Sequence, residues 1–483
     1  MRMLLLSVAD DDVVANGNDV SLCSERRVWM VTHVIMAMMV LVDRCRIYTV
    51  LLAYLSFIYC RRPPTDIITP HRPTSPRHLL NCPSSSSSLA CWCSIDLVVR
   101  CRGHSVTKVP QFPPEVDVVL AELNMAGTSV GKLLPDDFYG LRVRRVVLTE
   151  NQLSDDGLSE SAFSTLANHL TSLIIGACAI RTLPPRLLVD LTRLTVLQLW
   201  SNHIEVIPDN FFVANSELRE LSLWGNRLRT IHNRTLFGLF RLRMLDLDHN
   251  LITGVKRGAL SHVSDVLEVL RLSNNHISAL SASTFTDLLR LRVLTLASNR
   301  LLFVDARTFA GLHELRTLTV ANNRIQFLAD GAFQHLARLR TLNLSGNRLE
   351  RVWAGTFVGL RSLTTVDLSR NRLSRLPEAT FGHSPVVRRL VVEDNWLSTL
   401  GRCTLSSRAN VRSLSLIGNV LECDCRMAWI SHITTVLGNC VHDDETAQHE
   451  QVLPVHKTSA YIDYRFCSSA TYHSCLLWFK WVA

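Results

Sequence analysis

Apolar residues recur along this chain in one repeating pattern. The pattern L-x-x-L-x-L-x-x-N-x-L occurs thirteen times between residues 120 and 421, at spacings of 23 to 27 residues and most often 24. A fixed period of this size is typical of a protein in which each copy is one structural unit. The copies begin at Leu120, Val143, Leu170, Leu194, Leu218, Leu242, Leu267, Leu291, Leu315, Leu339, Leu363, Val387 and Val411.

An Asn occupies the same slot in eleven of the copies, and Thr128 and Cys178 take its place in the other two. A buried Asn amide can bond backbone groups at a turn, where no strand partner is available. We therefore expect a structural role for this slot, and a buried, unreactive thiol at Cys178. The slot holds Asn151, Asn202, Asn226, Asn250, Asn275, Asn299, Asn323, Asn347, Asn371, Asn395 and Asn419.

The x-L-x-L segment of each copy predicts a short strand whose Leu side chains point to one face. One copy cannot bury that face alone, so neighbours stack and share a core. We expect an α/β solenoid, a curved horseshoe with a parallel sheet on its concave side. A second buried row on the convex side is predicted at Leu188, Phe212, Leu236, Leu260, Phe285, Phe309, Phe333, Phe357 and Phe381.

Over residues 82–440 the chain resembles extracellular leucine-rich-repeat proteins with cysteine caps at both ends. Similar families are Slit, Kekkon and Tartan, together with Toll-like receptor ectodomains. The resemblance implies the curved horseshoe with disulfide caps, and a role in recognition. The motif is specific for the fold and weakly specific for function, because one fold hosts many binders.

The cysteines lie mainly at the two ends of the repeats. Of the 14, seven lie at or before Cys101 and six at or after Cys403, and Cys178 lies between them. This clustering indicates an oxidising compartment. The resemblance implies an N-terminal cap over residues 82–119 with the pairs Cys82–Cys93 and Cys91–Cys101. Zinc is the weaker interpretation of these cysteines, since no His sits at ligand spacing.

Residues 422–483 are expected to form a C-terminal cysteine cap and a divergent tail. The run from Asn419 through Cys423 and Cys425 to Trp429 resembles the C-terminal cap of the same proteins, with Val420 where Pro is usual. By that resemblance Cys423 pairs with Cys440. Cys425 needs a fourth cysteine, which is either Cys467 or Cys475.

Residues 1–60 are interpreted as a leader and residues 61–81 as a Pro-rich linker. The apolar runs at 28–42 and 47–60 are both shorter than the roughly 20 residues of a membrane-spanning helix. The second run fits either a signal peptide or an uncleaved signal anchor. The expected location is therefore extracellular or at the cell surface, with membrane attachment only through this anchor or a missing C-terminus.

Composition and motifs argue against catalysis. The chain is 47% apolar and 19% charged, with a net charge of +9, so it is not a disordered polymer. It lacks a P-loop, a G-x-G-x-x-G after a strand, a G-x-S-x-G and an H-E-x-x-H. We expect no enzyme activity, no cofactor and no metal, and the scattered His residues are interpreted as surface groups.

The exposed strand positions are the candidate binding surface. The third, fifth and seventh residues of each copy should point out of the concave face. Two Trp side chains would then stack on adjacent strands among charged neighbours, a composition typical of binding hot spots. The alternative is that the Trp pair simply covers the sheet. The predicted partner-binding residues are Gln198, Trp200, Trp224, Asp246, Asp248 and Arg271.

A row of Arg follows the Asn slot in four consecutive copies, at Arg300, Arg324, Arg348 and Arg372. Stacking places such residues about 5 Å apart, where like charges repel unless something anionic intervenes. A sulfated glycan or an acidic partner is one explanation. Solvated Arg paired with nearby Glu or Asp is the other, and the sequence alone favours it.

Two sequons, at Asn233 and Asn343, are candidate glycosylation sites, although a chance match is as good an interpretation. Taken together, the sequence predicts a non-enzymatic extracellular scaffold that binds a protein ligand or receptor on its concave face. The alternative is a secreted matrix protein that binds sulfated glycans. Nucleic acid is not an expected partner.

Overall fold

The structure is a computed structural model of the chain. It describes residues 91–111, 118–405, 411–422, 427, 429–430, 433–442 and 451–454, apart from residues 95 and 283. The predicted leader and linker lie outside the described residues. So do Cys82, Cys423, Cys425, Cys467 and Cys475.

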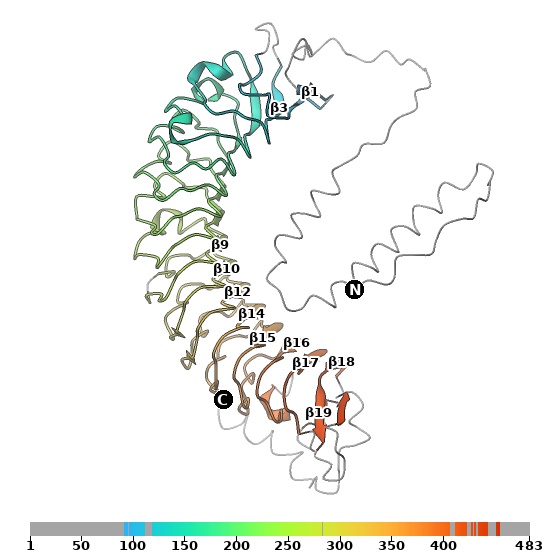
Figure 1. The fold of residues 1–483 in the computed structure, drawn as a ribbon. Helices are drawn as coiled ribbons and strands as arrows, with labels where there is room; N and C mark the ends of the chain where they lie inside the picture. The colour runs from blue at the N-terminus through green and yellow to red at the C-terminus, as the bar shows by residue number, and fades with distance from the viewer. Residues whose placement is uncertain are drawn as a thin grey trace, which may run out of the picture. The chain divides into compact units, whose positions relative to one another are not determined.

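The described chain is a stack of turns that follows a curved path, with its strands on the inner side of the curve (Figure 1). Each of the thirteen repeats contributes one strand to a single sheet, and these strands pair in parallel. They are β3 (Leu120–Asn124), β4 (Val143–Val147), β5 (Ser172–Ile174), β6 (Val196–Gln198), β7 (Glu220–Ser222), β8 (Met244–Asp246), β9 (Val269–Arg271), β10 (Val293–Thr295), β12 (Thr317–Thr319), β14 (Thr341–Asn343), β15 (Thr365–Asp367), β16 (Arg389–Val391) and β17 (Ser413–Ser415).

Equivalent Leu residues of successive repeats lie side by side in the sheet. Leu197 aligns with Leu221, and Leu221 aligns with Leu245. All three are buried, as are the Leu residues on either side of them in each repeat. The predicted parallel sheet and shared core are therefore confirmed.

The Asn slot forms a ladder of hydrogen bonds between turns. The Nδ2 of Asn323 donates to the carbonyl of Leu296 in the preceding turn (2.9 Å) and to that of Val320 in its own turn (3.0 Å). Its Oδ1 accepts the N–H of Leu301 (3.0 Å). The other Asn residues from Asn202 to Asn419 repeat this geometry.

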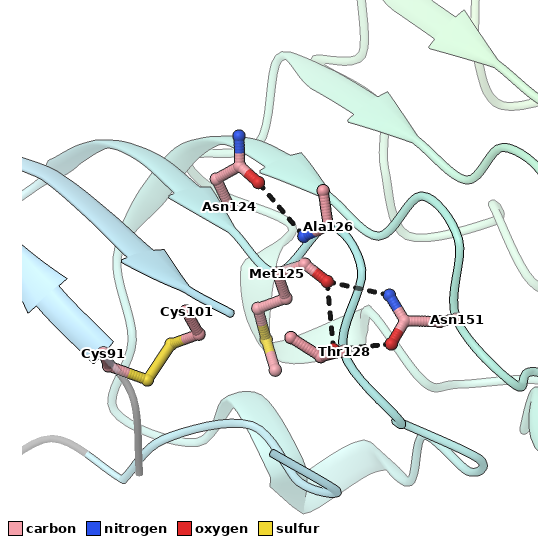
Figure 2. Close-up of a disulfide and its surroundings, with 7 residues drawn as sticks. All are labelled: Cys91, Cys101, Asn124, Met125, Ala126, Thr128 and Asn151. Carbon is pink, nitrogen blue, oxygen red and sulfur yellow. Dashed lines mark hydrogen bonds between the residues drawn. A yellow bond between two sulfur atoms is a disulfide. The ribbon is translucent and has the colours of Figure 1, made fainter. Parts of the chain in front are cut away.

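The two exceptions to the Asn slot fit the same ladder. The Thr128 hydroxyl donates to the Met125 carbonyl (3.0 Å) and lies 2.6 Å from Oδ1 of Asn151 (Figure 2). The Cys178 thiol donates to the Leu148 carbonyl (2.9 Å) and is buried. Burial raises the pKa of Cys178 to about 11, so the group is a protonated structural thiol at neutral pH, as predicted.

The convex side contains a stack of Phe rings. Phe285, Phe309, Phe333, Phe357 and Phe381 are buried, with successive centroids 4.9 to 6.5 Å apart. This confirms the second buried row.

The predicted horseshoe with its parallel sheet is confirmed, and within the described residues its return segments contain no α-helix. A 24-residue repeat returns the chain to the sheet through turns, which leaves room only for short 3-10 segments. They include η1 (Pro135–Phe138), η2 (Asp155–Gly157), η3 (Ser164–Leu166), η4 (Ser261–Val263) and η5 (Arg402–Thr404).

The first repeat is covered by a small disulfide-linked hairpin. Strands β1 (Cys91–Cys93) and β2 (Val98–Cys101) pair antiparallel, and β2 continues into the parallel sheet beside β3. The Cys91–Cys101 disulfide joins directly opposed residues, as the cap motif implies (Figure 2). Cys93 is also disulfide-bonded, and its predicted partner, Cys82, lies outside the described residues.

At the other end, β18 (Thr435–Leu437) adds in parallel to β17, and β19 (Asn439–His442) pairs antiparallel with β20 (Gln451–Pro454). Cys403, which the sequence analysis left unassigned, is disulfide-bonded. The pairings predicted for Cys423 and Cys425 fall outside the described residues. Within the described ranges, no helix has the length and apolarity needed to cross a membrane.

The ladder generates a stability prediction. Asn323→Ala should lower the free energy of unfolding by about 3 kcal/mol, because it leaves buried carbonyl and N–H groups without partners. The exposed neighbouring variant Arg324→Ala should change it by less than about 0.5 kcal/mol. Guanidinium denaturation followed by circular dichroism measures both, and equal midpoints for the two variants would contradict a structural role for the ladder.

Candidate recognition surface on the concave face

The predicted recognition residues lie at and just beyond the ends of β6, β7, β8 and β9. Each of these strands ends three residues before a position with a left-handed backbone, such as Ser201 (φ 51°), Gly225 (φ 69°) and His249 (φ 57°). The turn there brings Trp200, Trp224 and Asp248 into one row, because neighbouring repeats are in register. We call this row and its neighbours Gln198, Asp246, His249 and Arg271 the concave patch.

Trp200 is half-buried because it packs across the preceding repeat. Gly176 occupies the same row one turn earlier, and a Cβ built on it would lie 2.5 Å from Cε2 of the Trp200 ring. Only glycine leaves space for the indole at this position. Sequence reasoning missed this contact, although the signal was present: Gly176 lies 24 residues, one common period, before Trp200.

Trp224 is 37% exposed and packs against His249, with ring centroids 5.1 Å apart. Among the ring contacts of the described residues, none joins Trp200 to Trp224. The expected stacking of the two indoles is therefore wrong. Trp200 instead packs on Gly176 in the preceding repeat, and Trp224 packs on His249 in the following repeat.

Asp246 lies below the surface rather than at it. It is 7% exposed, and its carboxylate lies 3.5 Å from the Arg271 guanidinium and accepts the backbone N–H of Asp248 at 3.0 Å. The expectation that Asp246 points freely out of the concave face is therefore corrected. Asp246 is the last residue of β8, and a charge buried there must be paired.

Asp248 accepts the backbone N–H of Ser273 in the next repeat. Its pKa is raised to about 6, mainly because it is removed from water and also because Asp246 is close. Burial also lowers the pKa of His249. The patch thus combines an exposed ring pair, a carboxyl that titrates near pH 6 and a partly exposed Arg271 held by Asp246. Gln198 is half-buried at the end of β6.

Later strands present a plainer concave surface of half-buried Thr side chains, at Thr295, Thr317, Thr319, Thr341 and Thr365. Asn343, one of the predicted glycosylation sites, is half-buried on β14, and its Oδ1 accepts the N–H (2.9 Å) and the hydroxyl (2.7 Å) of Ser345. Asn233, the other, is exposed in a turn.

The Arg row lies on a different surface, beyond the Asn ladder. All four side chains are exposed. Arg372 lies 4.0 Å from Glu350, whereas Arg300, Arg324 and Arg348 form no ion pair with any described residue. Neutralisation by nearby acids, which the sequence favoured, therefore applies to one of the four. Within the described ranges, no group of three His, Cys, Asp or Glu side chains could hold a metal ion.

Comparison with known proteins agrees with this architecture. The leucine rich repeat family model matches residues 192–252, 265–325, 313–373 and 361–421, which carry strands β6 to β17. The chain is a leucine-rich-repeat protein. No curated protein sequence matches it.

Solved structures that match the chain include one from Drosophila and one from Listeria monocytogenes. A chain of the Drosophila Toll–Spätzle complex is 20% identical with a TM-score of 0.56, over 71% of this leucine-rich-repeat protein and 55% of that chain. This protein thus spans about half the length of the chain it matches, and at this identity the similarity is one of fold. An internalin from Listeria monocytogenes has 20% identity and a TM-score of 0.49, over 65% of this chain and 86% of its own.

The raised pKa of Asp248 leads to a pH prediction. The folded protein holds this proton more tightly than the unfolded chain, so the carboxyl favours folding at low pH, and that contribution is lost as the pH rises through about 6. Asp248→Asn removes the partly buried charge while its amide oxygen still accepts the Ser273 N–H. The variant should unfold at a higher temperature than the wild type at pH 7.5, and the difference should shrink by pH 4.5.

Thermal unfolding at the two pH values tests this expectation. Asp209→Asn, at an exposed position on another turn, serves as the matched control and should show no pH-dependent difference. A constant difference between the Asp248 variant and the wild type at both pH values would contradict the burial of this charge.

Proposed function

We propose that this leucine-rich-repeat protein is a non-enzymatic extracellular recognition protein that binds a protein partner through its concave patch. The observation that carries the proposal is the exposed Trp224–His249 ring pair, which shares four neighbouring repeats with the half-buried Trp200 and the Asp246–Arg271 ion pair. Aromatic and Arg side chains are enriched at the centres of protein interfaces. The carboxyl and guanidinium groups of the patch would fix the orientation of the partner.

The form of the site also favours a macromolecular partner over a small molecule. The patch extends across four adjacent strands, β6 to β9, and its side chains are held by contacts between repeats. Rigid aromatic groups lose little conformational freedom on binding, which strengthens association. The related Toll fold in complex with Spätzle is an instance of a leucine-rich-repeat protein that binds a protein, which supports the proposal by analogy of fold.

An extracellular location is part of the proposal. The Cys91–Cys101 disulfide, together with the oxidised Cys93 and Cys403, supports folding in an oxidising compartment. The apolar run at 47–60 would supply the targeting signal, either cleaved or retained as an anchor.

Substitution of the two Trp residues tests the recognition surface. The secreted protein would be screened against a panel of cell-displayed extracellular proteins, and the strongest binder titrated against variants. Trp224→Ala and Trp200→Ala should each weaken that complex about tenfold or more. Trp396→Ala removes an indole that is 61% exposed elsewhere on the chain and should leave the affinity unchanged. Equal affinities for all three variants would overturn the assignment of the concave patch.

Expression in cultured animal cells tests the location. We expect the protein in the medium, or on the cell surface if the apolar run is retained. Peptide mapping without reduction should recover a peptide pair linked through Cys91 and Cys101. A protein that stays inside the cell with these thiols reduced would contradict the extracellular assignment.

A further inference from the structure

A second surface of unusual composition lies beyond the Asn ladder in repeats eight to ten. We call it the flank surface and define it by Arg300, Leu302, Phe303, Arg324, Phe327 and Arg348. It is separate from the concave patch, which lies at the ends of strands in repeats four to seven. The backbone N–H of each of the three Arg residues donates to a carbonyl of the preceding repeat, at 2.8 to 2.9 Å. These bonds hold the three side chains one repeat apart.

The apolar part of the flank surface is built by two short strands. β11 (Phe303–Val304) and β13 (Phe327–Leu328) pair in parallel, with Phe303 opposite Phe327. Val304 and Leu328 point into the core, whereas both Phe side chains are 50% exposed. Leu302, 48% exposed, lies beside them in sequence.

Phe303 and Phe327 occupy the fourth position after the Asn slot. That position holds Gly254 and Ala279 in the two preceding repeats and Arg351 and Arg375 in the two following repeats. The core therefore does not require an aromatic ring at this position. Two aligned Phe rings kept in water mark a surface that is covered by something else, because an exposed apolar cluster is costly and typical of interaction sites.

The charged part of the flank surface is not neutralised. Arg300, Arg324 and Arg348 are exposed, and none forms an ion pair with a described residue. Elsewhere on the molecule, exposed Arg residues do have acid partners, such as Arg292 with Glu268 at 2.7 Å. Arg351, next in the Phe row, lies over the Trp353 ring at 5.8 Å and extends the basic and aromatic character by one repeat. Like charges in register repel each other and favour an anionic partner.

The two parts together select the class of partner. A sulfated glycan supplies anionic groups for the Arg row but has no apolar side chains to cover two Phe rings that carry no polar group. An acidic polypeptide satisfies both, because carboxylates pair with guanidinium groups while its apolar side chains pack on the rings. We propose that the flank surface binds an acidic protein segment that carries apolar side chains, with Arg300, Arg324 and Arg348 as charge contacts and Phe303 and Phe327 as apolar anchors.

Two synthetic polypeptides of equal length separate these contributions. The full secreted protein would be titrated with a random copolymer of Glu and Tyr, with poly-Glu and with heparin, at physiological salt. The Glu–Tyr copolymer should bind about tenfold more tightly than poly-Glu. Phe303→Ser with Phe327→Ser should remove that advantage and leave poly-Glu binding unchanged, while Arg300→Glu with Arg324→Glu should weaken binding of both polypeptides.

The matched control is Arg316→Glu with Arg340→Glu. This pair makes the same charge change in repeats nine and ten, on exposed residues that precede β12 and β14 instead of following the ladder. It should alter binding of either polypeptide by less than twofold. If both Arg pairs lost binding equally, net charge alone would account for the effect, and the proposal would be overturned.

Three further readouts complete the test. Heparin binding that exceeds copolymer binding and is insensitive to the Phe variants would assign the surface to glycans and overturn the proposal. Unfolding midpoints within 2 °C of the wild type would show that the half-exposed Phe sites were changed without loss of fold. Trp224→Ala should leave copolymer binding intact. The proposal for the flank surface can therefore fail or hold independently of the proposal for the concave patch.

Discussion

The buried Asn amide is the contact on which the rest of this structure depends. At the end of each strand the chain turns through a left-handed residue, and the carbonyls on both sides of the turn lose their sheet partners. One amide donates to carbonyls of two turns and accepts an N–H, as Asn323 does. Because an unpaired buried polar group is costly, this position tolerates only a side chain that can donate. Thr128 and Cys178 meet that requirement, which explains why they are the two exceptions.

The ladder also sets the register of every other row. Since successive turns are held at the same point, residues at equal positions in neighbouring repeats lie side by side, from the buried Leu rows to the stacked Phe rings. Exposed positions are then free to vary without disturbing the core. Recognition chemistry can thus collect on one part of the sheet and be absent from another, as the contrast between the concave patch and the Thr-lined later strands illustrates.

The two surfaces differ in how their charges are balanced. In the concave patch the main charges are satisfied internally, because Asp246 pairs with Arg271 and Asp248 accepts a backbone N–H from the next repeat. Its two indole rings also have packing partners, which are Gly176 for Trp200 and His249 for Trp224. On the flank surface the Arg side chains have no acid partner among the described residues. A surface whose charges are already paired and a surface whose Arg charges are unpaired suit different partners. The two surfaces are separate, so the proposals for them do not exclude each other.

The repeat period alone determined the strands, the Asn slot, the buried Phe row and the set of outward positions, because these depend only on spacing along the chain. It also placed Trp200, Trp224, Asp248 and Arg271 in one region. Tertiary structure decided what each side chain contacts. Trp200 packs on Gly176 because that residue leaves a gap, and Asp246 is buried and paired with Arg271 of the next repeat. The pairing of Phe303 with Phe327 likewise depends on how two turns stack. Period assigns a residue to a row, whereas its burial and contacts depend on the neighbours one repeat away.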